Sequence, residues 1–239
     1  LEQINNNLAF RSIAEHLQQT IYLHLVPQLL KHADEISGRL LEDDPFGQGL
    51  LQRIAKTPKK TRDARLIRIQ HVLEKAVPLF KELRFEQDKD SGLFHLEACY
   101  KHWRPQGAWQ REEQLSDGTL RLIGLMWALQ EGEGLLLLEE PELSLNDAVV
   151  DQIPLMVDRV LGKRKLPHRQ VFISTHSEKL LSQIADPNAI VLLEHGPDGT
   201  IVRPANAEEC QLINDGLSPA EVLLPKTHVP TITQISQIS

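Results

Sequence analysis

The sequence is poor in cysteine, in aromatic residues and in long hydrophobic runs. Its two cysteines, Cys99 and Cys210, lie 111 positions apart in a chain of 239 residues. They cannot form a dense disulfide framework or a CxxC zinc motif. No run of eighteen apolar residues occurs, so we expect no membrane span and no membrane partner. A composition of 41% hydrophobic and 25% charged residues indicates a globular chain, which we expect in the cytoplasm.

The phosphate-binding loop GxxxxGK[ST] is also absent from these residues. The nearest approximation is Gly162-Lys163, which has Val157 where the first glycine should stand. In that loop, backbone N–H groups cradle phosphates and a lysine reaches the β- and γ-phosphates. Any nucleotide chemistry of this chain therefore needs another source for the cradle.

The net charge of −7 conceals an uneven distribution of charge. Up to Arg111 the chain has 17 basic and 14 acidic residues, giving +3, whereas the remainder has 9 basic and 19 acidic residues, giving −10. One stretch sets seven basic residues against the single acid Asp63; these are Arg53, Lys56, Lys59, Lys60, Arg62, Arg65 and Arg68. Such a concentration can contact DNA phosphates, and a solvated helix face explains it almost as well.

The hydrophobic pattern predicts an α/β fold preceded by a helical subdomain. Apolar spacings of three to four predict helices over Leu8–Ala33 and Thr61–Phe80, and alternation predicts a strand over Phe94–Tyr100. Beyond Arg111, helices alternate with buried strands in the rhythm of a mainly parallel sheet. These strands are Leu135–Leu138, Val171–Ser174 and Ile190–Leu193. We therefore expect a helical subdomain (1–82), an α/β lobe (83–213) and a C-terminal tail (214–239).

Two short patterns in the α/β lobe suit the binding of an anion and a metal ion. Leu115–Thr119 contains residues that cap a helix, and an uncovered helix start offers N–H groups to a phosphate. Farther on, the apolar run Leu135–Leu138 ends in Glu139 and Glu140. Ligands of open parallel sheets bind at the carboxyl ends of the strands. Carboxylates placed there can hold Mg²⁺ through water and activate a water molecule.

Two further patterns follow these in the sequence. Leu143–Asn146 leads into the next helix, which by itself indicates only a helix start. His176 comes directly after the buried strand Val171–Ser174 and its following threonine, at the same edge of the sheet. A histidine in that place can donate a hydrogen bond to a phosphate oxygen.

In their order and spacing, the four patterns resemble the C-terminal half of an ABC-type ATPase head. The likeness is strongest to the RecF-like, SMC-like and OLD-like branch of AAA-type ATPases, and it covers about residues 93–193. Ser116 lies 23 positions before Glu139, which lies 37 positions before His176. LSDGT at 115–119 is similar to the signature motif, and the two glutamates are similar to the end of the Walker B strand. Residues 143–146 resemble the D-loop, and the histidine resembles the switch histidine.

This resemblance implies a role for each matching position. Glu140 is expected to be the general base, His176 the γ-phosphate sensor and Glu139 the Mg²⁺ ligand. Ser116, Asp117 and Gly118 are expected to contact ATP bound by a second protomer, and the expected D-loop residues are Ser144, Leu145 and Asn146. ATP, Mg²⁺ and a homodimer are thus implied. The sequence departs from transporter ATPases at Glu139 and Asn146, where the family usually has Asp.

In this family a phosphate-loop lobe precedes such a helical region. We therefore expect the chain to be the C-terminal portion of a longer protein, inactive in ATP hydrolysis by itself. Two functions fit these features. The first is part of an ATPase in DNA maintenance or anti-phage defence, and the second is a nucleotide-dependent dimerisation module that signals to an effector such as a nuclease. A transporter ATPase fits less well, because LSDGT with Glu-Glu-Pro-Glu is not transporter-like.

Overall fold

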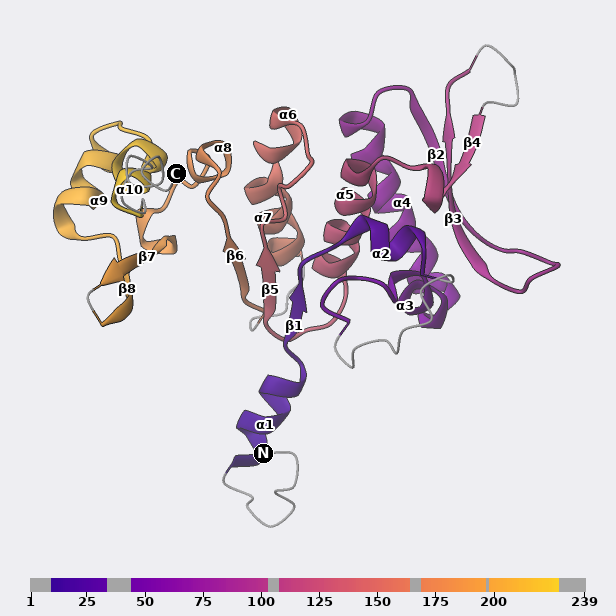
Figure 1. Cartoon of the computed structure of the whole chain (residues 1–239), viewed down its shortest axis with the longest axis horizontal. Helices are drawn as coiled ribbons and strands as arrows, with labels where there is room; N and C mark the ends of the chain where they lie inside the picture. Colours follow the sequence, from indigo (N-terminus) through magenta and orange to yellow (C-terminus); the bar gives the residue numbers. More distant parts are fainter. Residues whose placement is uncertain (1–9, 34–43, 103–107, 164–168, 197, 228–239) are drawn as a thin grey trace, which may run out of the picture.

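The computed structural model describes residues 10–33, 44–102, 108–163, 169–196 and 198–227. Figure 1 shows an elongated arrangement, with a parallel sheet and its helices in the middle. An antiparallel sheet lies at one end, and a hairpin with two helices lies at the other. The fold class is therefore α/β, as the sequence predicts. Within the described ranges, no helix is both long enough and apolar enough to cross a membrane.

The central sheet contains three parallel strands in the order β1-β5-β6. They are β1 (Ile21–Leu23), β5 (Leu136–Glu139) and β6 (Val171–Ser174). Leu138 lies beside Leu23 on one side and beside Ile173 on the other. All three strands consequently end at the same edge of the sheet. Two of the three strands predicted beyond Arg111, Leu135–Leu138 and Val171–Ser174, are confirmed to within one residue.

The helix expected over Leu8–Ala33 is wrong, because a strand of the central sheet lies within it. The segment contains α1 (Arg11–Gln18), β1 and α2 (Pro27–Lys31). Leu23 and Leu25 are buried whereas Tyr22 is exposed, which is the alternation of a strand. Pro27 stands at the first helical position of α2, where its fixed φ suits the helix.

Three helices lie side by side near this sheet, with α5 in the middle (Figure 1). They are α4 (Lys59–Ala76), α5 (Asp117–Gln130) and α7 (Ile153–Lys163). Eleven of the fourteen residues of α5 are buried, and Trp127 lies beneath the guanidinium of Arg65 at 5.1 Å. Arg169 donates hydrogen bonds to the carbonyls of Ala128 at 2.7 Å and Gly132 at 2.9 Å. These bonds attach Arg169 to the end of α5, where the Ala128 carbonyl also accepts from the Glu131 N–H at 3.2 Å.

An antiparallel sheet precedes α5 in the chain. Its strands β2 (Phe80–Gln87), β3 (Phe94–Tyr100) and β4 (Ala108–Arg111) lie in that order, and α3 (Leu50–Lys56) and α4 contact it. The predicted strand over 94–100 is confirmed. The helix predicted over Thr61–Phe80, which is α4, ends at Ala76. It stops there because Val77 precedes Pro78 and takes an extended backbone with ψ 120°. Phe80 therefore begins β2 instead of ending a helix.

The C-terminal elements form a small unit of their own. They are α8 (Glu178–Leu181), β7 (Val191–Gly196), β8 (Gly199–Pro204), α9 (Ala207–Asn214) and α10 (Pro219–Thr227). The expectation that Ile190–Leu193 extends the parallel sheet is wrong, because β7 pairs antiparallel with β8 in a separate sheet. Val191 and Leu193 are exposed while Leu192 is buried, so one face of this hairpin is turned to solvent. The last predicted segment, 214–239, includes α10, and residues 228–239 lie outside the described ranges.

A buried carboxylate holds this C-terminal unit together. The Glu209 side chain is fully buried and accepts hydrogen bonds from Arg203 Nη1 at 2.7 Å and Lys226 Nζ at 2.6 Å. The Asn206 N–H also donates to it at 2.7 Å. These donors, Arg203 foremost, lower the pKa of Glu209 from 4.5 to about 2. The ionised carboxylate therefore joins β8, α9 and α10.

We expect Glu209→Gln to lower the free energy of unfolding of the protein at pH 7 by about 2–3 kcal/mol, since the amide loses two ion pairs. Because the folded-state pKa is depressed, this contribution is complete above pH 4.5 and is lost as the pH falls toward 2. In urea unfolding measured from pH 7 to pH 3, the difference in free energy of unfolding between wild type and Glu209→Gln should become smaller. The matched control is Glu208→Gln, at an exposed neighbouring acid. An equal effect of both substitutions, or a gap that does not change with pH, would contradict this role.

Two isoleucines of α4 test how much its buried face contributes to stability. Ile69 is completely buried, whereas Ile67 is 56% exposed. Ile69→Ala should lower the free energy of unfolding by about 2–5 kcal/mol, because it leaves a cavity between α4 and the core. Ile67→Ala should change it by less than about 1 kcal/mol. Thermal unfolding of both variants measures the difference, and similar melting temperatures would refute this packing.

Candidate functional site

The candidate site lies where β5 and β6 end. Glu139 pairs with Ser174 across the two strands, and the N–H of Glu140 donates to the Ser174 carbonyl at 3.0 Å. Glu140 has φ +41°, a left-handed conformation that is uncommon for a non-glycine residue. Such strain is held in place by surrounding structure and is frequent at functional sites. It turns the chain sharply directly after the strand.

Glu140 and His176, predicted as base and sensor, are in direct contact. His176 Nδ1 lies 2.5 Å from Glu140 Oε1, and the side chains are 74% and 30% exposed. An ionised carboxylate only accepts, so Nδ1 carries the proton of this hydrogen bond. A protonated imidazole has a second donor at Nε2, which can bind a phosphate oxygen. The structure thus brings together two residues that are 36 positions apart in the sequence.

Glu139 has surroundings that suit a metal-binding carboxylate. The Tyr22 hydroxyl on β1 donates a hydrogen bond to its Oε2. This bond is the main reason that the pKa of Tyr22 is raised, which keeps the phenol protonated as a donor. Glu139 Oε1 lies 4.0 Å from His24 Nδ1, a buried atom with no hydrogen-bond partner among the described residues. Mg²⁺ binds through one or two carboxylates and retains several waters, so the half-exposed Glu139 fits a hydrated Mg²⁺.

The predicted signature residues lie at the start of α5. Ser116 caps this helix by accepting from the Thr119 N–H at 3.1 Å. Asp117 accepts hydrogen bonds from Lys31 Nζ at 2.7 Å and from Gln28 Nε2 at 2.6 Å. The Lys31 hydrogen bond is the largest cause of the lowered pKa of Asp117. The carboxylate therefore stays ionised, and its charge is balanced by α2.

The signature and the predicted D-loop form one surface. A Cβ on Gly118 would lie 2.5 Å from the Ser144 carbonyl oxygen, so only glycine fits there without displacing the backbone. Ser144 itself has φ +62°, and the Leu145 side chain also packs against Gly118. Asn146 caps α6 (Asp147–Val150) by accepting from the Val149 N–H at 3.0 Å. Gly118 thus has a packing requirement that its position in a motif does not reveal.

Two further residues connect the parts of the site. Glu142 is buried and accepts a hydrogen bond from Thr175, which ties the loop after β5 to the loop after β6. Arg121 lies one turn after Asp117, and burial is the main cause of its lowered pKa. Together with Glu139 it lines a cavity of about 10 Å³, which has room for a single water molecule. The site is therefore an exposed edge and not an enclosed nucleotide pocket.

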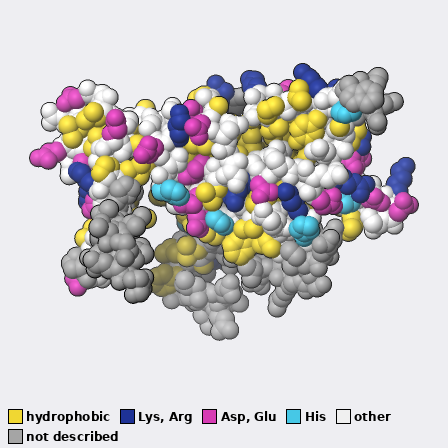
Figure 2. Space-filling model, turned by 45° about the horizontal axis from the view of Figure 1, so that its top comes forward, with side chains coloured by type: hydrophobic (Ala, Val, Ile, Leu, Met, Phe, Trp, Pro, Cys, Tyr) yellow, Lys and Arg dark blue, Asp and Glu magenta, His cyan; other side chains and the backbone are white. Residues whose placement is uncertain are grey.

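The residues predicted for DNA contact do not act as one free basic face. The arginines contact partners within the chain: Arg53 with Asp44 and Glu131, Arg62 with Asp63 and Phe85, Arg65 with Trp127, and Arg68 with Gln130. The lysines are exposed; they are Lys56, Lys59 and Lys60. On the face drawn in Figure 2, Lys and Arg lie along the upper edge and also across the middle to the right, where Asp and Glu stand among them; acids are frequent at the left as well. DNA contact through this stretch stays a prediction.

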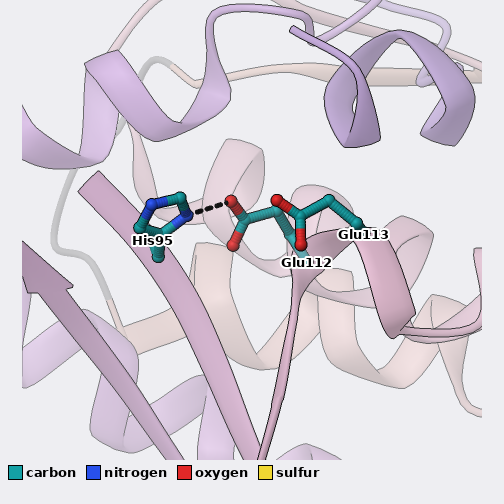
Figure 3. A group of neighbouring side chains, drawn as sticks. All are labelled: His95, Glu112 and Glu113. Atoms are coloured by element: carbon teal, nitrogen blue, oxygen red, sulfur yellow. Dashed lines mark hydrogen bonds and ion pairs between the residues drawn. The ribbon is translucent and has the colours of Figure 1, made fainter. Parts of the chain in front are cut away.

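A group of metal-ligand type lies before the signature (Figure 3). His95 of β3 and Glu112 of the 3-10 helix 112–114 are buried, whereas Glu113 is exposed. Both oxygens of Glu112 are already engaged, Oε1 with His95 Nδ1 at 2.7 Å and Oε2 with the Leu96 N–H at 2.8 Å. These contacts have a structural role. They attach the segment that enters the signature to the antiparallel sheet.

Sequence reasoning missed Tyr22, His24, Gln28 and Lys31 because it placed all four in a helix. The available signal was the alternation of Leu23 and Leu25 with polar neighbours, which is too short to outweigh the helical spacing around it. Arg121 gave no signal at all, since an arginine next to apolar helix residues is usually solvated.

One family of known proteins matches most of this chain. The sequence profile of a family described as "AAA domain, putative AbiEii toxin, Type IV TA system" matches residues 2–182. No curated protein matches the sequence.

Several solved SMC heads are similar to this chain at low identity. An SMC head with a coiled coil and joint from Pyrococcus yayanosii has 17% identity and a TM-score of 0.48, over 65% of this chain and 29% of that one. An SMC head bound to the winged-helix domain of ScpA has 17% identity and a TM-score of 0.48, and the match covers 80% of this chain and 56% of that one. An SMC ATPase solved in work on ATP-driven dimerisation and DNA-stimulated activation has 16% identity and a TM-score of 0.45. That match covers 65% of this chain and 92% of the other. This chain spans less than two thirds of the first two proteins.

The contact between Gly118 and Ser144 can be tested with two glycine substitutions. We expect Gly118→Ala to lower the free energy of unfolding by roughly 1–3 kcal/mol, because the methyl group displaces the Ser144 backbone. Gly162→Ala on α7 is the control, since nothing lies within 4 Å of the added Cβ. It should leave stability unchanged or raise it by up to about 1 kcal/mol. Urea unfolding compares the two, and an unaffected Gly118→Ala variant would contradict the contact.

Proposed function

This chain belongs to the AAA domain family described above, and from that premise we propose that it serves in ATP hydrolysis as part of a head-to-head ATPase dimer. The observation that carries the proposal is the Glu140–His176 contact at the carboxyl edge of the parallel sheet. A carboxylate directly after a buried strand, paired with a histidine from the next strand, suits the activation of water beside a phosphoryl group. Glu139 is the last residue of β5 and directly precedes Glu140.

In the proposed reaction, Glu140 accepts a proton from the water molecule that attacks the γ-phosphorus. The bond to the β-γ bridging oxygen breaks, and ADP leaves with the electron pair of that bond. With Nδ1–H held by Glu140, the imidazolium form of His176 donates a hydrogen bond from Nε2 to a γ-phosphate oxygen, where negative charge has to be stabilised. Glu139, positioned by Tyr22, would hold Mg²⁺, which would supply positive charge to balance that of the phosphates.

The start of α5 is proposed to contact nucleotide held by the second protomer. Ser116 and Gly118 lie on the surface shared with Ser144 and Leu145, so one docking event would bring the signature and the D-loop to the partner together. The Asp117 charge would disfavour a phosphate, but Lys31 already pairs with it. Since the 239 residues contain no GxxxxGK[ST], we propose that the phosphate cradle comes from outside these residues.

A second candidate function is nucleotide-dependent dimerisation that signals to an effector such as a nuclease. It is favoured by the surface shared by the signature and the predicted D-loop, which would dock to a second protomer whether or not ATP is hydrolysed. A role in DNA maintenance or in anti-phage defence is part of the proposal for either candidate. The exposed lysines at 56, 59 and 60 support the DNA half.

The decisive variant is Glu140→Gln in the natural protein. The amide cannot accept a proton, so steady-state phosphate release should fall by roughly 10²- to 10⁴-fold, while ATP-dependent dimerisation, measured by light scattering, should persist. Glu133→Gln, at an exposed acid outside the site, is the control and should keep full activity. Unchanged turnover in Glu140→Gln would remove this residue from the base role.

The 239 residues alone provide the second arm of the test. They should hydrolyse ATP only at background rate, because the cradle is missing from them. Turnover by these residues that disappears in Glu140→Gln would overturn the external cradle. ATP-dependent dimers of the natural protein without any turnover would favour the signalling candidate.

A further inference from the structure

A groove of about 830 Å³ lies between α4, α5 and the α6–α7 segment, away from the carboxylate edge. We call it the cationic groove. Three exposed basic side chains line it, Arg68 and Lys75 of α4 and Arg159 of α7. Its inner lining includes the buried Met126 of α5 and the half-buried Met156 of α7. It therefore combines a basic rim with an apolar interior.

The composition of the groove differs from that of the surrounding sequence. Although the chain after Arg111 has a net charge of −10, none of the described residues that line the groove is acidic. The chain has only two methionines, and both line it. Methionine side chains are flexible and polarisable, and they are frequent on surfaces that adapt to a bound helix. Charge and composition thus both point to an amphipathic partner of negative charge.

The size of the groove agrees with this partner. Two turns of α-helix, about 10 Å across and 11 Å long, occupy roughly 850 Å³. A nucleic acid fits less well, because the usual stacking platforms for bases are Phe, Tyr and Trp, and none of these is among the described residues that line the groove. Arg68 Nε also donates a hydrogen bond at 2.5 Å to Oε1 of Gln130, which lines the groove as well. The observations therefore favour a helix over a phosphate backbone.

We infer that the cationic groove binds an acidic amphipathic helix of a partner protein. Apolar residues of the helix at positions i, i+3, i+4 and i+7 pack against the methionines, and flanking carboxylates pair with the rim. Asn146, the cap of α6, also lines the groove, so the bound helix reaches the segment that carries Ser144. This inference concerns binding alone, and it stands or falls independently of the proposed ATP hydrolysis.

The test is a fluorescence anisotropy titration with a labelled helical peptide of about 15 residues. Leucines form one stripe and glutamates flank it. We expect binding that is at least about tenfold tighter than for a peptide of equal composition whose leucines are scattered around the helix, or for one with lysine in place of glutamate. Equal binding of the scattered peptide, or no binding up to about 1 mM, would overturn the inference.

Variants of the protein locate the binding. The double variant Lys75→Glu/Arg159→Glu should weaken peptide binding about tenfold or more, and Leu155→Asp, at an exposed residue of the lining, should also weaken it. The matched control is Lys59→Glu/Lys60→Glu, which makes the same charge change on α4 outside the groove. An equal loss in the control would show unspecific attraction and refute the groove. If a short DNA duplex displaces the peptide, and the Lys75→Glu/Arg159→Glu variant no longer binds that duplex, the basic rim binds phosphates and the inference is overturned.

Discussion

The parallel pairing of β5 with β6 is the constraint on which the candidate site depends. Because Glu139 stands opposite Ser174, β5 and β6 end level with each other. The loops that follow these two neighbouring strands therefore bring Glu140 and His176 into contact. A shift of one residue would bury Leu135 and Leu137 in place of Leu136 and Leu138, and it would move the two side chains apart. The register in which Leu136 and Leu138 are buried therefore sets the geometry of the polar residues that follow them.

The sequence predicted those parts of the structure in which a long apolar run meets a functional pattern. The strands before Glu139 and His176, the cap at Ser116 and the strand over 94–100 all have burial patterns strong enough to decide their form. The predictions failed where the pattern was short or was decided by distant residues. Leu17, Ile21, Leu25 and Leu29 are spaced like a helix, and only pairing with β5 makes Ile21–Leu23 a strand. Ile190–Leu193 is as apolar as a central strand, yet the chain returns as β8 and leaves part of it exposed.

The same reasoning explains why the site was predicted only in part. Motif spacing indicates which residues converge on one edge of a sheet, and Glu139, Glu140 and His176 converge as expected. It does not indicate what holds them there. Tyr22 on Glu139, Lys31 on Asp117 and the Ser144 carbonyl against Gly118 are contacts between segments far apart in the chain. Such contacts depend on how α2 and β1 return to the sheet, which a single sequence does not encode in any short pattern.

The burial of α5 has a consequence for how the protein responds to heat and to solvent. This helix begins at the signature surface and continues as the most buried helix of the core, with Trp127 completely enclosed and Arg169 closing its end. A segment of this kind cannot open locally without exposing the core, so it belongs to the most protected cooperative unit of the fold. Backbone amides of α5 beyond its first turn should consequently exchange with deuterium only through global unfolding. The signature surface is then lost on heating at the temperature at which the whole core melts.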